Sequence, residues 1–170
     1  LHVRGFTKHN SSKVKNKGCY AGIVEKIPYL KELGVTTIEL MPAYEYDEII
    51  LEGAGKGKVN YWGYGDGNYF APKESFSKKG RGSQVNEFKE MVKQLHKNKI
   101  EVIMEFHFIQ GMSPHIIMDA LRFWILEYHI DGIHVNFDVA PLNMIKSDPL
   151  ISMVKIISNY DTGEDIKDYC

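Results

Sequence analysis

Residues 20–42 read YAGIVEKIPYLKELGVTTIELMP, and this stretch joins a helical pattern directly to a strand pattern. Apolar residues recur at helical spacing over residues 22–33, at Ile23, Ile27, Leu30 and Leu33. Gly34 is a typical stop signal for such a helix. Pro28 conflicts with one continuous helix because it lacks a backbone donor, so it indicates a kink or a later helix start. The β-branched run 35–41 then predicts a strand.

The segments on either side of this unit repeat the same alternation. Strands are predicted at residues 1–7, 35–41, 100–108, 130–139 and 150–158. Helices are predicted at residues 22–33, from a Ser83 cap to the Lys-rich run 96–99, and from Ser113 to Tyr128. Right-handed crossovers between successive strands make the sheet parallel, so the fold class is α/β. Periodicity alone does not choose between an open doubly wound sheet and part of a barrel.

A stretch of about forty residues, 42–82, separates two of these elements and is rich in Gly, Tyr and Asn. We expect it to lack regular structure and to form a substrate-facing loop, because connections of this length are usually functional. The GAGKGK run at residues 53–58 does not have the spacing of a phosphate-binding loop, and we interpret it as a flexible loop.

Composition limits the classes of function. At 170 residues the chain is predicted to be one domain, residues 1–170, with no second complete domain. The net charge of −1 argues against a nucleic-acid or membrane-surface partner, and no apolar run reaches the roughly 18 residues of a membrane span. Two cysteines predict a reducing cytoplasm, and neither a metal nor a cofactor is expected. Because the first residue is Leu, the sequence is also compatible with a piece of a longer protein.

Several motifs identify a family. Residues 2–7 (HVRGFT) and 20–35 resemble the first βα unit of the α-amylase family of glycoside hydrolases. Residues 38–42 (IELMP), 60–65 (NYWGYG) and 68–72 (NYFAP) resemble the second strand and following loop of its debranching branch, which comprises isoamylases, pullulanases and glycogen debranching enzymes.

This resemblance implies a (β/α)8 TIM barrel. A closed barrel usually takes about 250 residues, so we expect a partial barrel of about five parallel strands with flanking helices. Its first and last strands are then exposed edges, at which a protein partner could pair.

The resemblance also implies where catalytic groups belong, and here the sequence departs from the family. The strand-four motif, Asp-Gly-Phe-Arg-Phe-Asp in the family, is residues 131–136 (DGIHVN), which places Asn136 at the nucleophile and His134 at the arginine. An amide cannot form a glycosyl ester. An alternative alignment with a two-residue insertion makes Asp138 the nucleophile, since residues 134, 136 and 138 of a strand share one face.

The other implied groups are altered too. Gln110 takes the place of the sugar-binding His of strand three, and Ser158 or Asn159 takes the place of the acid/base Glu of strand five. Tyr64 matches the aromatic platform that stacks on the sugar, whereas neighbouring Trp62 is interpreted as packing the loop onto the barrel. The predicted catalytic set is therefore not intact, and the predicted substrate-binding residues are Tyr64, Gln110 and His134.

Three functions remain open at this point. The first is an α-glucan-associated relative of debranching enzymes that has lost hydrolysis and retains glucan binding. The second is an active α-glucan hydrolase that uses Asp138, together with Glu105, in a rearranged site. The third is a non-catalytic interaction module.

Overall fold

The computed structural model describes residues 1–49, 56–136 and 138–158. Its elements in chain order are α1 (Val3–Lys8), η1 (Asn10–Ser12), α2 (Tyr20–Glu25), α3 (Ile27–Glu32), β1 (Thr37–Leu40), β2 (Tyr44–Tyr46), β3 (Gly67–Pro72), η3 (Glu74–Phe76), α4 (Gln84–Lys97), β4 (Glu101–Phe106), α5 (Pro114–Tyr128), β5 (Gly132–Val135), α6 (Leu142–Ser147), η4 (Ile151–Met153) and β6 (Lys155–Ser158). No helix in these ranges is long and apolar enough to cross a membrane.

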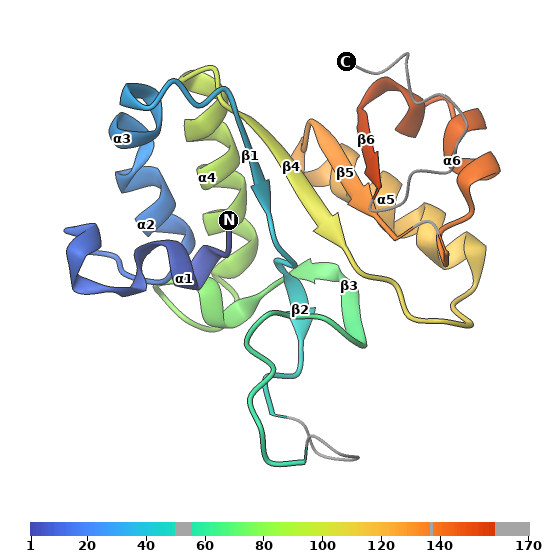
Figure 1. Ribbon diagram of the computed structural model, residues 1–170, viewed down its shortest axis with the longest axis horizontal. Helices are drawn as coiled ribbons and strands as arrows, with labels where there is room; N and C mark the ends of the chain where they lie inside the picture. Colours follow the sequence, from blue (N-terminus) through green and yellow to red (C-terminus); the bar gives the residue numbers. More distant parts are fainter. Residues whose placement is uncertain (50–55, 137, 159–170) are drawn as a thin grey trace.

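A four-stranded sheet in the order β1-β4-β5-β6 organises the fold, and all three strand pairs are parallel. Figure 1 shows α2, α3 and α4 beside β1 and β4, and α5 beside β5 and β6. The helices bury the apolar stripes that periodicity predicts. In α4 the buried residues are Phe88, Met91, Val92 and Leu95. The parallel α/β sheet expected from the sequence is confirmed, with four strands in the described residues where five were predicted.

The predicted strand at residues 1–7 is wrong. His2 accepts a hydrogen bond from the Gly5 amide through Nδ1, at 2.9 Å, and this cap starts helix α1. Only Leu1 behaves as a strand residue, because it donates to Glu39 O at 2.5 Å and accepts from Met41 N at 2.9 Å along the free edge of β1. Local sequence did not reveal the cap because histidine is an uncommon capping residue.

The single helix predicted at residues 22–33 is two helices. Helix α2 ends before Lys26, and Pro28 lies in the first turn of α3, where a missing amide hydrogen breaks no intrahelical bond. The later start that Pro28 indicated is therefore what the chain adopts. Gly34 has a φ of +76°, which fits the predicted stop after α3.

Four further predictions require correction. The segment 42–82 contains regular structure, because β2 and β3 pair antiparallel within it. The strand predicted at 130–139 ends at Val135, and the one predicted at 150–158 begins only at Lys155, after η4. Helix α6, which was not predicted, lies between these two strands. Ser83 precedes α4 as expected, but its hydroxyl donates to Gly80 O and does not cap an amide.

The sheet is curved, and cross-strand contacts on one face show it. His134 of β5 contacts Glu39 of β1, although β4 lies between those two strands. In the same way Lys155 of β6 pairs with Glu101 of β4 across β5. Gly132 of β5 leaves the space for this second pair, because an added Cβ would lie 2.9 Å from Lys155 Cβ. Side chains of alternate strands can meet in this way only on the concave side of a sheet, as expected for part of a barrel.

Candidate functional site

The carboxyl ends of the parallel strands gather most of the predicted site residues. Figure 1 shows that the arrowheads of β1, β4 and β6 point toward the side of the molecule where β2 and β3 lie. Tyr64 precedes β3, Gln110 follows β4, and Asn136 and Asp138 follow β5. This edge is where α/β barrels place their chemistry.

Asn136 is used as a structural clamp. The Phe108 amide donates to Asn136 Oδ1 at 3.0 Å, and Asn136 Nδ2 donates to the Phe108 carbonyl at 3.0 Å. The amide thus pairs with both backbone groups of a residue whose own side chain is fully buried. A carboxylate could accept the first hydrogen bond but has no hydrogen to donate to the second. The position at which the family resemblance expects the nucleophile therefore holds β4's extension against β5.

Asp138 does not lie on a strand. The amides of Val139 and Ala140 donate to Asn136 O at 3.1 and 3.0 Å, so the chain turns directly after β5. The expectation that residues 134, 136 and 138 share one strand face is wrong for this reason. Asp138 is exposed, and Gln110 Nε2 donates to its Oδ2 over a long 3.4 Å. The structure thus brings two predicted residues, Gln110 and Asp138, together at the surface.

The acid/base position carries no acid in the described residues. Ser158 is the last residue of β6 and lies opposite Val135 of β5. Its side chain is a hydroxyl, which is a poor general acid at neutral pH. Asn159, the alternative, lies outside the described residues.

His134 forms a tight pair that the sequence did not predict. Its Nδ1 lies 2.5 Å from Glu39 Oε1, and the imidazole is largely buried on the concave face. An arginine at this position would present a permanently charged fork toward the strand ends. Histidine is shorter and its ring is held by Glu39. Glu39 is the one charged residue in the predicted strand 35–41, and this was the signal that could have identified it.

Tyr64 sits in a loop that its neighbours make rigid. Asn60 accepts from the Gly63 amide at 3.0 Å and donates to the Tyr64 carbonyl at 3.0 Å. Gly63 has a φ of +85°, and an added Cβ would lie 2.6 Å from Tyr46 Cε1, so no other residue fits there. These contacts hold the backbone on which Tyr64 sits.

The Tyr64 ring is accessible and its hydroxyl is anchored. The residue is 41% exposed, and its hydroxyl donates to Glu105 Oε2 at 3.3 Å. Burial of the hydroxyl and the neighbouring Glu105 carboxylate raise the pKa of Tyr64 to about 12, so the phenol stays protonated as a donor. The His107 ring meets the Tyr64 ring edge-on at 5.4 Å. An exposed ring with a polar neighbour suits the C–H face and hydroxyls of a sugar.

Trp62 packs less than expected. Its ring makes edge contacts with His2 and Tyr61, at 5.6 and 5.1 Å between centroids, and the residue is still 51% exposed. The interpretation that Trp62 packs the loop onto the barrel accounts for only part of its surface.

No group of three His, Cys, Asp or Glu side chains in the described ranges is arranged to hold a metal ion. The groups near the strand ends are the Tyr64 ring, the Gln110 amide, the His134 imidazole and two carboxylates. Glu105 accepts a hydrogen bond from Tyr64, and Asp138 accepts one from Gln110. Such groups can bind hydroxyls of a neutral ligand.

Comparisons with known proteins fit this geometry. The family described as alpha amylase, catalytic domain, matches residues 4–109. The chain is 36% identical to isoamylase SU1, chloroplastic, of Zea mays over 190 aligned residues, which cover 84% of this chain and 24% of the relative. It is 31% identical to the glycogen operon protein GlgX homolog of Mycobacterium bovis over 231 residues, covering 96% of this chain and 31% of that protein. Pullulanase type I from Bacillus subtilis str. 168, complexed with maltose, superposes with a TM-score of 0.66 at 23% identity, covering 80% of this chain and 26% of that chain.

The extent of these matches is itself informative. The chain spans 24% and 31% of the length of the two curated relatives. Both alignments, over 190 and 231 residues, exceed the 170 residues of this chain, so the relatives contain residues that it lacks. The solved structure supports the fold, which is part of a (β/α)8 barrel.

The expectation of a cytoplasmic location is wrong, because the Zea mays relative is named as chloroplastic. A low cysteine count separates reducing from oxidising compartments, and it does not separate one reducing compartment from another.

The family match covers more than half of the chain, and the curated relatives name isoamylase and a glycogen operon protein. The chain therefore belongs to the α-amylase family, as a partial relative of its debranching branch.

Proposed function

We propose that this chain is a single barrel domain of an α-glucan-associated protein that binds glucan and has lost hydrolysis. The observation that carries the proposal is the Asn136 clamp, in which the amide donates to and accepts from the Phe108 backbone. Hydrolysis with retention of configuration needs two carboxyl groups about 5 to 5.5 Å apart, one as the nucleophile and one as the general acid/base. An amide committed to the backbone at the first of these positions cannot serve.

The acid/base carboxyl group is also missing from the described residues. Ser158 occupies one of the two acid/base positions that the alignment offers. Removing a catalytic nucleophile alone costs about 10⁴-fold or more in rate, and the losses do not add because the groups act together. Binding by the surrounding groups survives such losses.

Glucan binding is supported by the strand-end groups. The half-exposed Tyr64 ring offers an apolar face with Glu105 at its hydroxyl, and Gln110 and His134 supply further hydrogen-bonding groups on or after strands β4 and β5. The solved pullulanase from Bacillus subtilis was complexed with maltose, which is an α-glucan fragment. We infer that α-glucan is the ligand class of this chain too.

An active hydrolase that uses Asp138 is the alternative, and one experiment separates the two. Purified protein is incubated with pullulan and with glycogen, new reducing ends are measured, and the Asp138→Ala variant is run in parallel. We expect no reducing ends above the buffer control from either protein. Reducing ends that appear with wild type and vanish with Asp138→Ala would overturn the proposal.

Glucan binding is tested separately by affinity electrophoresis in gels that contain glycogen. We expect wild type to be retarded and Tyr64→Ala to be retarded less than wild type, with Trp62→Ala as the control for a second exposed ring. If wild type is not retarded, the glucan-binding proposal fails.

The interaction-module prediction is then favoured as the second candidate. The observation on its side is the edge strand β6 and the η4 turn before it, where Ile157 of β6 is 36% exposed and Met153 of η4 is 82% exposed.

A further inference from the structure

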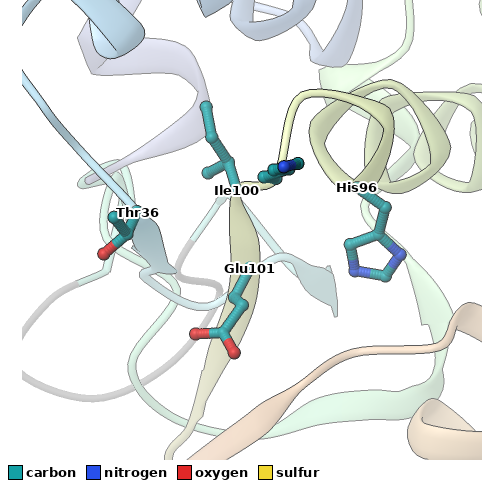
Figure 2. A pocket seen from close by; sticks show the side chains of 5 residues that line it. Thr36, His96, Ile100 and Glu101 are labelled. Atoms are coloured by element: carbon teal, nitrogen blue, oxygen red, sulfur yellow. The ribbon is translucent and has the colours of Figure 1, made fainter.

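An open pocket of about 440 Å³ lies at the amino-terminal ends of the strands, where α4 ends and β4 begins. Asn136 lies at the opposite, carboxyl-terminal ends. Thr36, His96, Lys99, Ile100 and Glu101 line the pocket. In Figure 2, Thr36 and His96 stand on opposite sides of the pocket, with Ile100 and Glu101 between them. Its volume lies within the range of small-molecule sites.

The acidic groups around this pocket are already compensated. Glu101 accepts hydrogen bonds from Lys155 and Thr37, which together hold the pKa of its carboxyl below the usual value. Asp131 accepts from His96 Nε2 at 2.7 Å and from the Val102 amide at 2.8 Å. Neither carboxylate therefore needs a further cation.

Lys99 is the cation that remains. It is exposed, and its ammonium makes no hydrogen bond or ion pair to any residue that the structure describes. Lys97, two residues earlier in the same Lys-rich helix end, is likewise exposed. The described side chains that remain without a partner at the pocket mouth are thus positive. The carboxyl end of α4 carries a partial negative charge, which favours cations at this place and offsets part of that positive charge.

The backbone at Lys99 has the left-handed conformation with which helices commonly end, and a lysine is strained in that conformation. Its φ is +60°, in the left-handed region that Gly or Asn usually occupies after a helix. The bonds that close the helix, from Lys99 N to His96 O and from Ile100 N to Leu95 O, involve backbone atoms only. Glycine would make the same bonds without strain, whereas a lysine places a cation at the carboxyl end of α4, where the helix dipole favours one.

We propose that Lys99 and His96 form a binding site for a small phosphorylated ligand at this pocket. The Lys99 ammonium supplies a point charge for the phosphate oxygens. His96 Nε2 donates to Asp131, which leaves Nδ1 of the imidazole as an acceptor for a hydroxyl of the ligand. Thr36 adds a hydroxyl, and Ile100 an apolar surface for the organic part. The shared chemistry is the phosphate dianion, carried either by free phosphate or by a sugar phosphate.

The test uses Lys99→Gly, with Lys13→Gly as its matched control. Lys13 is an exposed lysine with a φ of +56° at the end of η1, and it does not line the pocket. Both substitutions relieve the same backbone strain, so both variants should melt about 2–4 °C above wild type. Neither variant is expected to lose the fold.

Binding is measured by thermal shift and by calorimetry with inorganic phosphate, with glucose 6-phosphate and with potassium chloride at equal ionic strength. We expect both phosphates to stabilise wild type and Lys13→Gly beyond the chloride control. In Lys99→Gly the affinity should fall about tenfold or more. Tighter binding of glucose 6-phosphate identifies a sugar phosphate, and equal binding identifies phosphate itself; both outcomes support the site. A wild type that responds only as it does to chloride, or an unchanged affinity in Lys99→Gly, would refute it.

Discussion

Restoring a carboxylate at the nucleophile position should harm the fold and restore nothing. In Asn136→Asp the new carboxylate still accepts from the Phe108 amide, but it cannot donate to the Phe108 carbonyl 3.0 Å away. That carbonyl oxygen is partly buried and loses the hydrogen bond that Asn136 donates to it. An unpaired buried acceptor costs about 1–3 kcal/mol. For a domain of this size that is a fall in Tm of about 2–12 °C.

The loss should depend on pH in a defined direction. The ionised carboxyl faces a carbonyl oxygen in the folded state, so its folded pKa lies above the unfolded value of about 3.9. Below about pH 4 the carboxyl is protonated in both states, and its O–H can donate to Phe108 O as the amide did. Stability close to wild type is therefore present at low pH and is lost as the pH rises through the folded pKa.

Thermal unfolding of wild type, Asn136→Asp and Asn136→Ala between pH 4 and pH 7 measures this. Asn136→Ala loses both hydrogen bonds, and its deficit should not change with pH. The clamp is refuted if Asn136→Asp melts with wild type at pH 7, or if its deficit is independent of pH. New reducing ends from pullulan with Asn136→Asp would contradict the claim that a carboxylate at this position is insufficient.

Three further outcomes are expected. Gly63→Ala should destabilise the fold by about 2–4 kcal/mol in urea unfolding, because its Cβ would lie 2.6 Å from the Tyr46 ring and its φ is +85°; an unchanged midpoint would show that the loop relaxes freely. Tyr64→Ala should weaken maltohexaose binding by about 2- to 10-fold in calorimetry, while Tyr64→Phe keeps most of the affinity because the ring face remains; equal loss in both variants would assign the binding to the hydroxyl. Burial raises the pKa of Asp148, but its hydrogen bonds from backbone amides and from Arg122 outweigh this and leave the pKa lowered. Its contribution is therefore present above about pH 4 and lost as the pH falls further, so the stability gap between wild type and Asp148→Asn should close in acid; a gap that widens below pH 4 would contradict this sign.

Periodicity in the sequence was sufficient for the elements that have one clearly apolar face. Helix α4 buries Phe88, Met91, Val92 and Leu95 at helical spacing, and β1 and β4 lie within the two runs predicted as strands. Predictions failed where capping or turning depended on a particular side chain. The His2 cap makes a helix of residues predicted as a strand, and the turn after Val135 cuts short the strand predicted to reach residue 139.

The sequence by itself determined the fold class, the family and the identity of the residues at the expected catalytic positions, because these depend on local pattern and on residue type. Only the tertiary structure decided what those residues do. The His134–Glu39 pair joins residues 95 apart in sequence, and the Asn136 clamp joins residues 28 apart. Local periodicity encodes which face of an element is buried, and it carries no information on which side chain from a distant strand will meet that face. The curvature of the sheet supplies that information, and it exists only once the strands have paired.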